Sequence, residues 1–183
     1  MKVYTRTGDD GTTGLFYGGR VAKDGPQPWA YGTADEAQAV LGVARAHCEP
    51  GSELDELLVK LCHDLYVLMA ELATLPENRH KLAAGQTLVT EAMVQALEHL
   101  IDDVSARFEM PKEFVIPGRN LVAAHLDLAR TVVRRAERLA LRVAPPGSQV
   151  VPYLNRLSDL CWTLARWQEG ESLASRQVHG TGD

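Results

Sequence analysis

The leucine spacing between Ser52 and Thr74 constrains the fold of this chain more than any other feature. Pro76 ends the segment, and leucine stands at positions 54, 57, 58, 61, 65, 68 and 72. Because residues three and four apart share a helix face, this spacing gives one broad apolar stripe. A helix with such a stripe must bury it against other elements. The segment 52–74 is therefore predicted to be one helix of a larger packed unit.

Four more segments have helical spacing. We expect helices over residues 29–47, 87–107, 121–143 and 152–168, and the first could equally start near Pro26 or Pro28. Residues 33–36, Thr-Ala-Asp-Glu, have the form of a capping box. Proline and glycine separate the segments, and no run of β-type alternation occurs. The pattern predicts an all-α fold: a five-helix antiparallel bundle with a ferritin-like up-down arrangement and a glycine-rich N-terminal loop.

Composition limits the classes of function. With 183 residues and 45% hydrophobic residues, we expect a single domain over residues 1–169 and a flexible polar tail over residues 170–183. The formal net charge of -5 gives no general attraction to nucleic acid or to a membrane surface. The first residues lack the apolar core of a signal peptide, and no uninterrupted apolar run is long enough to span a bilayer. A cytoplasmic location is expected.

The cysteines and histidines do not suggest a protein-bound metal. Three cysteines are widely spaced, and neither a CxxC nor an HExxH pattern occurs. The adjacent Cys62, His63 and Asp64 would point about 100° apart on a helix and could not converge on one ion. We expect reduced thiols that are mostly packed in the interior.

The segment 121–143 carries a cationic face. On a helical wheel, Arg130, Arg134, Arg138, Glu137 and Asp127 fall within roughly 100°, and the opposite arc is apolar, with Leu128, Val132, Ala136 and Leu139. A solvated helix face explains this stripe as well as a binding site does. The use of Arg in place of Lys favours binding, because a guanidinium makes bidentate contacts with phosphate oxygens.

The N-terminal segment TRTGDDGTTGLF, residues 5–16, could supply the other half of an anion site. Gly8, Gly11 and Gly14 allow backbone N–H groups to approach an anion, and Lys23 follows. Hydroxyl donors come from Thr5, Thr7, Thr12 and Thr13. The segment matches neither a P-loop nor a dinucleotide fingerprint, so by itself it could also be a flexible polar arm. Asp9 and Asp10 are hypothesised to shape the turn by side-chain to backbone hydrogen bonds, or to order Mg²⁺ or Arg6.

Seven separated motifs identify the chain as similar to PduO-type ATP:cob(I)alamin adenosyltransferases. They are TRTGDDGTTGLF, GGRVAKD, YGTADEA, AELAT, EFVIPG, ARTVVRRAER and YLNRLSDL, and they cover residues from about 3 to 168 in order. The resemblance implies a homotrimer of five-helix bundles, with ATP and the corrinoid held between subunits. It implies transfer of the 5′-deoxyadenosyl group of ATP to cob(I)alamin, with triphosphate as leaving group, Mg²⁺ bound through the ATP phosphates, and a reductase that supplies the electron.

The resemblance also assigns roles to residues. The ATP site would comprise Thr5, Arg6, Thr7, Gly8, Thr13, Gly14, Lys23, Arg134, Arg135, Glu137, Arg138 and Asn155. Asp35 would pair with Arg130, across the subunit boundary, and these two residues and Arg134 would be catalytic. Phe114 would bind the cobalamin and displace its lower axial ligand.

Some positions depart from the family pattern. Arg119 and Asp127 stand where glycine and histidine are common, Ala37 and Gln38 replace the end of a DELN sequence, and Tyr17 occupies a frequent glycine position. Because Asp127 shares the predicted face of Arg130 and Arg134, it is expected to neutralise part of their field, which Arg119 could restore. An active enzyme with an altered corrinoid pocket is the first hypothesis. A non-catalytic sensor or carrier of ATP or cobalamin is the second, and an ATP-hydrolysing protein unrelated to corrinoids is the third.

Overall fold

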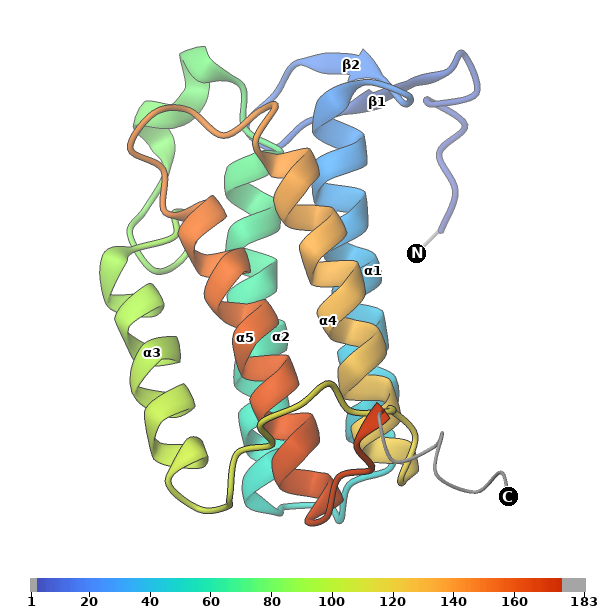
Figure 1. Ribbon diagram of the computed structural model, residues 1–183. Coiled ribbons are helices and arrows are strands. Elements are labelled where there is room, and N and C mark those ends of the chain that lie inside the picture. The colour runs from blue at the N-terminus through green and yellow to red at the C-terminus, as the bar shows by residue number, and fades with distance from the viewer. Residues whose placement is uncertain (1–2, 176–183) are drawn as a thin grey trace.

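A computed structural model describes residues 3–175, and these residues form a bundle of five α-helices (Figure 1). The fold class predicted from the sequence is confirmed. The helices are α1 Pro26–Ala46, α2 Glu53–Leu72, α3 Glu91–Ser105, α4 Leu121–Ala140 and α5 Val150–Glu169. A 3₁₀ helix, η1 Pro76–Lys81, follows α2, and two short strands, β1 Thr12–Gly14 and β2 Arg20–Ala22, precede α1.

The helices lie side by side along one axis, with α3 at the outer edge against α5 (Figure 1). The hydrophobic core lies between α1, α2, α4 and α5. Leucines of α2 and α5 fill it, among them Leu58, Leu61, Leu154 and Leu157. On α1 and α4 the buried residues are mainly alanines, namely Ala30, Ala34, Ala37, Ala44, Ala123, Ala129, Ala136 and Ala140. Small side chains let two helix backbones approach closely, so α1 and α4 form a tight antiparallel pair.

The structure selects one of the starts expected for the first helix and moves the start of the third. The first helix begins at Pro26, the earlier of the starts that the sequence allowed, so the predicted capping box at Thr33 is wrong. The Thr33 hydroxyl instead donates to the Trp29 carbonyl oxygen (2.8 Å) in mid-helix. The third helix begins at Glu91 because Thr90 Oγ1 accepts a hydrogen bond from the Met93 backbone N–H. Thr87 closes the preceding turn, its Oγ1 accepting from the Ala83 N–H (2.8 Å).

The buried arc of α4 is displaced from the one on the helical wheel. Leu128, predicted to be buried, is 49% exposed, whereas Asp127, predicted to lie on the cationic face, is only 7% exposed. The reason is that α4 packs against both α1 and α5, so its buried arc is set by two neighbours. Arg134 and Arg138 stay on the exposed arc as predicted.

The glycine-rich N-terminal segment contains a small antiparallel hairpin that sequence reasoning did not predict. Thr12, Thr13 and Gly14 pair with Ala22, Val21 and Arg20. The backbone N–H of Phe16 donates to the carbonyl oxygen of Ala73 (2.9 Å), which fastens the hairpin to the end of α2. The turn between the strands places Tyr17 at φ 61°, a left-handed conformation that favours glycine. A glycine, which the resemblance places at this position, would adopt this conformation without strain.

Glu71, the acid of the AELAT motif, is a buried junction of three segments. Its carboxylate is 1% exposed and accepts hydrogen bonds from Arg79 Nη2 (2.7 Å), the Val89 backbone N–H (2.8 Å) and Ser148 Oγ (2.7 Å). These partners come from η1, from the segment before α3 and from the segment before α5. A fully partnered buried carboxylate of this kind holds loops at the end of a bundle in one arrangement.

Within residues 3–175, every helix is too short or too polar to cross a membrane.

Candidate functional site

The N-terminal hairpin encloses a polar pocket of about 270 Å³, here called the loop pocket. Its lining residues are Thr5, Arg6, Thr7, Gly8, Asp9, Thr12, Thr13, Gly14, Arg20 and Lys23. They include every N-terminal residue that the resemblance assigned to ATP. Three cationic side chains and one carboxylate line the pocket. The local charge therefore favours an anion, although the chain as a whole is acidic.

Asp10 shapes the turn that forms this pocket. Its Oδ1 accepts hydrogen bonds from the Thr12 backbone N–H (2.9 Å) and from Thr12 Oγ1 (2.7 Å). These bonds favour the ionised form and lower the pKa of Asp10 below its ordinary value, with a smaller contribution from the charge of Arg20. The carboxylate is thus engaged in an Asx-type turn. This geometry agrees with the hypothesis that Asp10 organises the backbone around the anion site.

Arg20 is the pocket residue that sequence reasoning missed. Its Nη2 donates to the Thr7 carbonyl oxygen (2.6 Å) and to Thr12 Oγ1 (2.6 Å), and it lies 3.8 Å from Asp10 Oδ1. The guanidinium thereby ties the start of the segment to the hairpin. Its position in the GGRVAKD motif, three residues before Lys23, is the sequence feature that could have indicated it. Its contacts with Thr7 and Thr12 follow only from the strand pairing that places Arg20 opposite Gly14.

Gly8 allows Lys23 to approach the backbone. A Cβ atom at position 8 would lie 3.1 Å from both Cε and Nζ of Lys23 and 2.9 Å from the Thr12 carbonyl oxygen. A side chain there would press against the Thr12 carbonyl group and crowd the end of the Lys23 side chain. The hydroxyls of Thr5 and Thr7 are 2.8 Å apart, beside Arg6 in a left-handed conformation (φ 63°). The segment therefore presents hydroxyl and cationic donors together.

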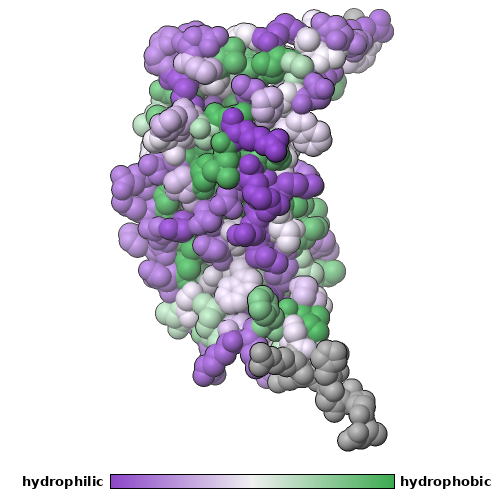
Figure 2. Space-filling model, turned by 45° about the horizontal axis from the view of Figure 1, so that its top comes forward, coloured by the Kyte–Doolittle hydropathy of each residue, from purple (hydrophilic) through white to green (hydrophobic). Residues whose placement is uncertain are grey.

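The predicted ATP residues of α4 and α5 do not line the loop pocket. Arg134 and Arg138 are exposed, and Figure 2 shows a band of strongly hydrophilic side chains over α4. Arg135 forms an ion pair with Glu36 of α1. Glu137 Oε1 accepts a hydrogen bond from Asn155 Nδ2 (2.9 Å). In one chain the predicted ATP site is therefore divided into two parts.

Phe114 lies at a larger cavity of about 790 Å³, here called the Phe114 cavity. The phenyl ring is 90% exposed on the loop before α4. The loop is held by residues 173–175: the Ile116 N–H donates to the Leu173 carbonyl oxygen (2.9 Å) and the Ser175 N–H to that of Phe114 (2.8 Å). The cavity wall includes Asp127, Arg130, Trp162 and Arg166. It lies toward the start of α4, whereas the hairpin lies at the opposite end of the bundle, beside the start of α1 (Figure 1).

Asp127 does not face the predicted triphosphate site. Its Oδ2 accepts a 2.5 Å hydrogen bond from Arg166 Nη2, and its Oδ1 lies 3.7 Å from Arg130 Nε. Arg166 is 1% exposed and also lies against Glu169, with Nε to Oε2 at 3.0 Å. The expectation that Asp127 neutralises part of the cationic face agrees with its ion pair with Arg130, while its other oxygen is engaged by the buried Arg166. Arg119 lies near Glu171 of the C-terminal segment (3.9 Å).

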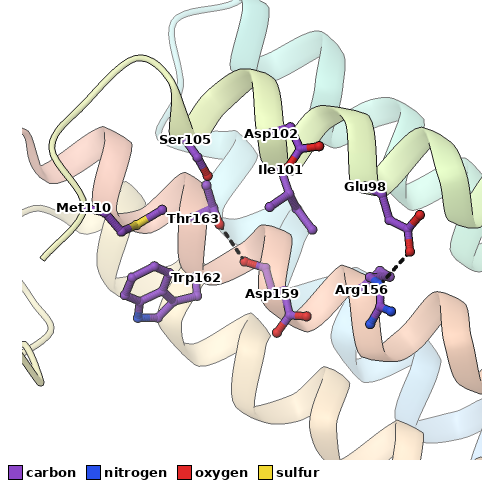
Figure 3. Close-up of a pocket in the computed structure, with 9 residues that line it drawn as sticks. All are labelled: Glu98, Ile101, Asp102, Ser105, Met110, Arg156, Asp159, Trp162 and Thr163. Carbon is purple, nitrogen blue, oxygen red and sulfur yellow. Dashed lines mark hydrogen bonds and ion pairs between the residues drawn. The ribbon is translucent and has the colours of Figure 1, made fainter. Parts of the chain in front are cut away.

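A second cavity of about 480 Å³ opens between α3 and α5 (Figure 3). Glu98 and Arg156 form an ion pair at one end of it (2.8 Å), Trp162 and Met110 lie at the other, and Ile101 lies between them (Figure 3). None of the residues that the sequence assigned to ATP or cobalamin lines it. Trp162 belongs to its wall and to the wall of the Phe114 cavity.

Histidine, cysteine and acidic side chains do not gather in groups of three or more that could hold a metal, as far as the described residues are concerned.

The fold and the two sites define a helical-bundle protein with a polar, cation-lined loop pocket and a separate, larger cavity. The family model for cobalamin adenosyltransferase matches residues 3–168. A corrinoid adenosyltransferase of Citrobacter freundii is 43% identical over 171 residues, which cover 92% of this chain and 95% of the relative. A corrinoid adenosyltransferase of Bacillus subtilis is 39% identical over 173 residues, covering 91% and 86%.

A solved structure extends the comparison to three dimensions. It is a variant PduO-type ATP:corrinoid adenosyltransferase from Lactobacillus reuteri complexed with cobalamin and ATP. The two folds superpose with a TM-score of 0.84 at 27% identity, covering 96% of this chain and 97% of the other. The chain belongs to the cobalamin adenosyltransferase family.

Proposed function

We propose that this chain is an ATP:corrinoid adenosyltransferase that moves the 5′-deoxyadenosyl group of ATP to cob(I)alamin. The observation that carries the proposal is the convergence of Thr5, Arg6, Thr7, Gly8, Thr13, Gly14 and Lys23 on one cationic pocket. The family resemblance assigns the same residues to ATP. The relatives named above are corrinoid adenosyltransferases, and the Lactobacillus reuteri structure holds both cobalamin and ATP.

The chemistry requires a stabilised leaving group. A Co–C bond forms as the cobalt(I) electron pair attacks C5′, and the C5′–O bond breaks so that triphosphate departs with that bond's electrons. Cationic donors at the triphosphate lower the barrier because negative charge grows there. Lys23 and Arg6 of the loop pocket, with Arg134 and Arg138 of α4, would supply these donors. Mg²⁺ would enter with ATP, bound by phosphate oxygens. No general base is needed, because cobalt(I) carries no proton.

We propose a homotrimer in which the two parts of the ATP site meet between subunits. Exposed apolar side chains on α1 and α4 support an interface there, among them Trp29, Val43 and Leu128. The position of Asp35 agrees with this arrangement. Because α1 and α4 are antiparallel and Glu36 meets Arg135, Asp35 stands roughly 9 Å along the axis from Arg130. This offset favours an Asp35–Arg130 pair between subunits over one within a chain.

Phe114 is proposed to contact the corrinoid from its lower face and to exclude the lower axial ligand. The exposed ring at the mouth of a 790 Å³ cavity supports this role, because an apolar group there would occupy the space of a polar ligand. Without that ligand, cob(II)alamin is easier to reduce to the nucleophile. A reductase in the cytoplasm would supply the electron, and residues 1–169 would form the catalytic domain.

An anaerobic assay tests the proposed function. The protein is mixed with ATP, Mg²⁺ and chemically reduced cobalamin, and the absorption spectrum is followed. We expect a light-sensitive alkyl-cobalt product and an equimolar amount of triphosphate. ATP binding without this product would overturn the proposal in favour of a carrier or sensor, and release of free phosphate would favour ATP hydrolysis.

A further inference from the structure

Asp127 is shared by two arginines at the wall of the Phe114 cavity. Its two carboxylate oxygens face different partners: Oδ2 accepts from Arg166 Nη2 at 2.5 Å, and Oδ1 lies 3.7 Å from Arg130 Nε. Arg166 comes from α5, one helix away from the α4 residues. All three side chains line the cavity, together with Trp162.

The Arg166 side chain is an anchor that has little freedom to move. It is 1% exposed, and it is held on three sides: by Asp127, by Glu169 Oε2 at 3.0 Å from Nε, and by the Trp162 ring at 5.7 Å from Cζ. A buried guanidinium requires such partners, because an unpaired buried charge is strongly destabilising. The position of Asp127 is therefore set by a rigid cation beneath it.

Arg130, in contrast to Arg166, is partly exposed and has fewer partners. Its side chain is 35% exposed, and the contact with Asp127 uses the inner nitrogen, Nε, which is buried without a hydrogen-bond partner. The terminal NH₂ groups are therefore left for a ligand in the cavity or for a neighbouring subunit. A carboxylate at Nε limits the rotation of the guanidinium about its stem. The orientation of Arg130 thus depends on Asp127, and through it on Arg166.

We propose that Asp127 and Arg166 are positioning residues for the corrinoid half of the reaction, because they orient Arg130 at the wall of the Phe114 cavity. The inference rests on the proposed function. It assigns a role to a position where the chain departs from the histidine common in similar sequences. A histidine cannot reproduce the arrangement: its neutral ring offers one acceptor and its charged ring none, whereas the carboxylate faces two cations.

Loss of the Asp127 carboxylate should affect the corrinoid and not ATP. The loop pocket and the Phe114 cavity share no lining residue. Loss of the carboxylate should therefore weaken corrinoid binding or slow the transfer step without changing ATP affinity. A purely structural role would lower the amount of folded protein and would affect both substrates equally.

Asp127→Asn, Asp127→His and Asp127→Glu test the proposal in the full-length protein. The control is Glu53→Gln, which removes an ion pair with Arg107 (2.7 Å), and neither of these residues lines the loop pocket or the Phe114 cavity. Affinity for cob(II)alamin is measured by absorbance titration of the ATP-loaded protein, together with kcat and both KM values. We expect Asp127→Asn and Asp127→His to lose about tenfold in corrinoid affinity or kcat/KM, a change of about 1.4 kcal/mol. We expect the KM for ATP to stay within about twofold.

Asp127→Glu keeps the negative charge and should therefore retain more corrinoid affinity than Asp127→Asn and Asp127→His. This variant also provides a test if the other two variants fail to fold. Equal corrinoid affinity in wild type and Asp127→Asn, or equal loss for both substrates, would overturn the positioning role. An inactive wild-type protein would instead overturn the proposed function, so the two failures are distinguishable.

Discussion

Arg20 Nη2 donates a 2.6 Å hydrogen bond to the carbonyl oxygen of Thr7, across thirteen residues of sequence. With the bonds of the same guanidinium to Thr12, this contact closes the N-terminal segment onto the hairpin. The loop pocket therefore depends on an arginine that need not touch ATP itself. Its role is to hold the donors of the segment in place.

Arg20→Met should weaken ATP binding by about tenfold. Without these hydrogen bonds, ATP binding must also order the N-terminal segment, which costs about 1.4 kcal/mol of binding free energy. Isothermal titration with a non-hydrolysable ATP analogue measures the effect. Arg142→Met is the matched control, since Arg142 is exposed near the end of α4 and outside the loop pocket. Unchanged affinity in Arg20→Met would show that the segment is ordered without this contact.

Arg134→Ala should abolish turnover and leave the fold intact. The side chain lies on the exposed arc of α4, so its removal uncovers no core, but it takes away a cation proposed for the triphosphate. Steady-state kinetics and thermal unfolding are measured together. A variant that turns over at the wild-type rate would identify the arginine stripe as a solvated helix face.

Phe114→Ala should impair the reaction from cob(II)alamin with a weak reductant more than the reaction from preformed cob(I)alamin. The ring is proposed to exclude the lower ligand, which affects only the reduction. Leu121→Ala, another exposed apolar residue near the start of α4, is the control. Equal impairment from both starting states would contradict the ligand-excluding role.

Glu71→Ala should lower the free energy of unfolding by about 3 kcal/mol or more, because Arg79, the Val89 N–H and Ser148 lose a buried acceptor. Urea unfolding gives the value. Glu98→Ala removes a carboxylate that is 44% exposed and should cost less than about 1 kcal/mol. Similar losses for the two variants would show that burial does not govern the contribution of Glu71.

Cys161 should resist thiol reagents in the folded protein. Burial raises the pKa of its thiol to about 12, from an ordinary 9.0. Above pH 9 the unfolded chain loses this proton while the folded chain keeps it, so the thiol destabilises the folded state as pH rises from 9 toward 12. The stability difference between wild type and Cys161→Ala should therefore move in favour of the variant over that range. Urea midpoints at pH 8 and pH 10.5 check this, and an unchanged difference would contradict it.

Much of the bundle could be predicted from local patterns. Leucines at helical spacing on α2 and α5 dictate amphipathic helices, and prolines and glycines mark the connections. Motifs also located most residues of the loop pocket, because those residues are close in sequence, but they did not reveal Arg20, whose contacts depend on the pairing of β1 with β2. Residues on distant segments could be assigned only through the resemblance, and their roles remain proposals.

The sequence alone thus determined the fold class, the family and the glycine-rich segment that lines the loop pocket, since each depends on local periodicity or on motifs in order. Tertiary structure decided which charges face one another. Asp127 is shared between Arg130 of its own helix and the buried Arg166 of α5, and Arg20 is bonded to Thr7, because packing of α4 on α5 and of β1 on β2 brings distant residues together. A helical wheel treats each helix in isolation, whereas burial depends on all its neighbours.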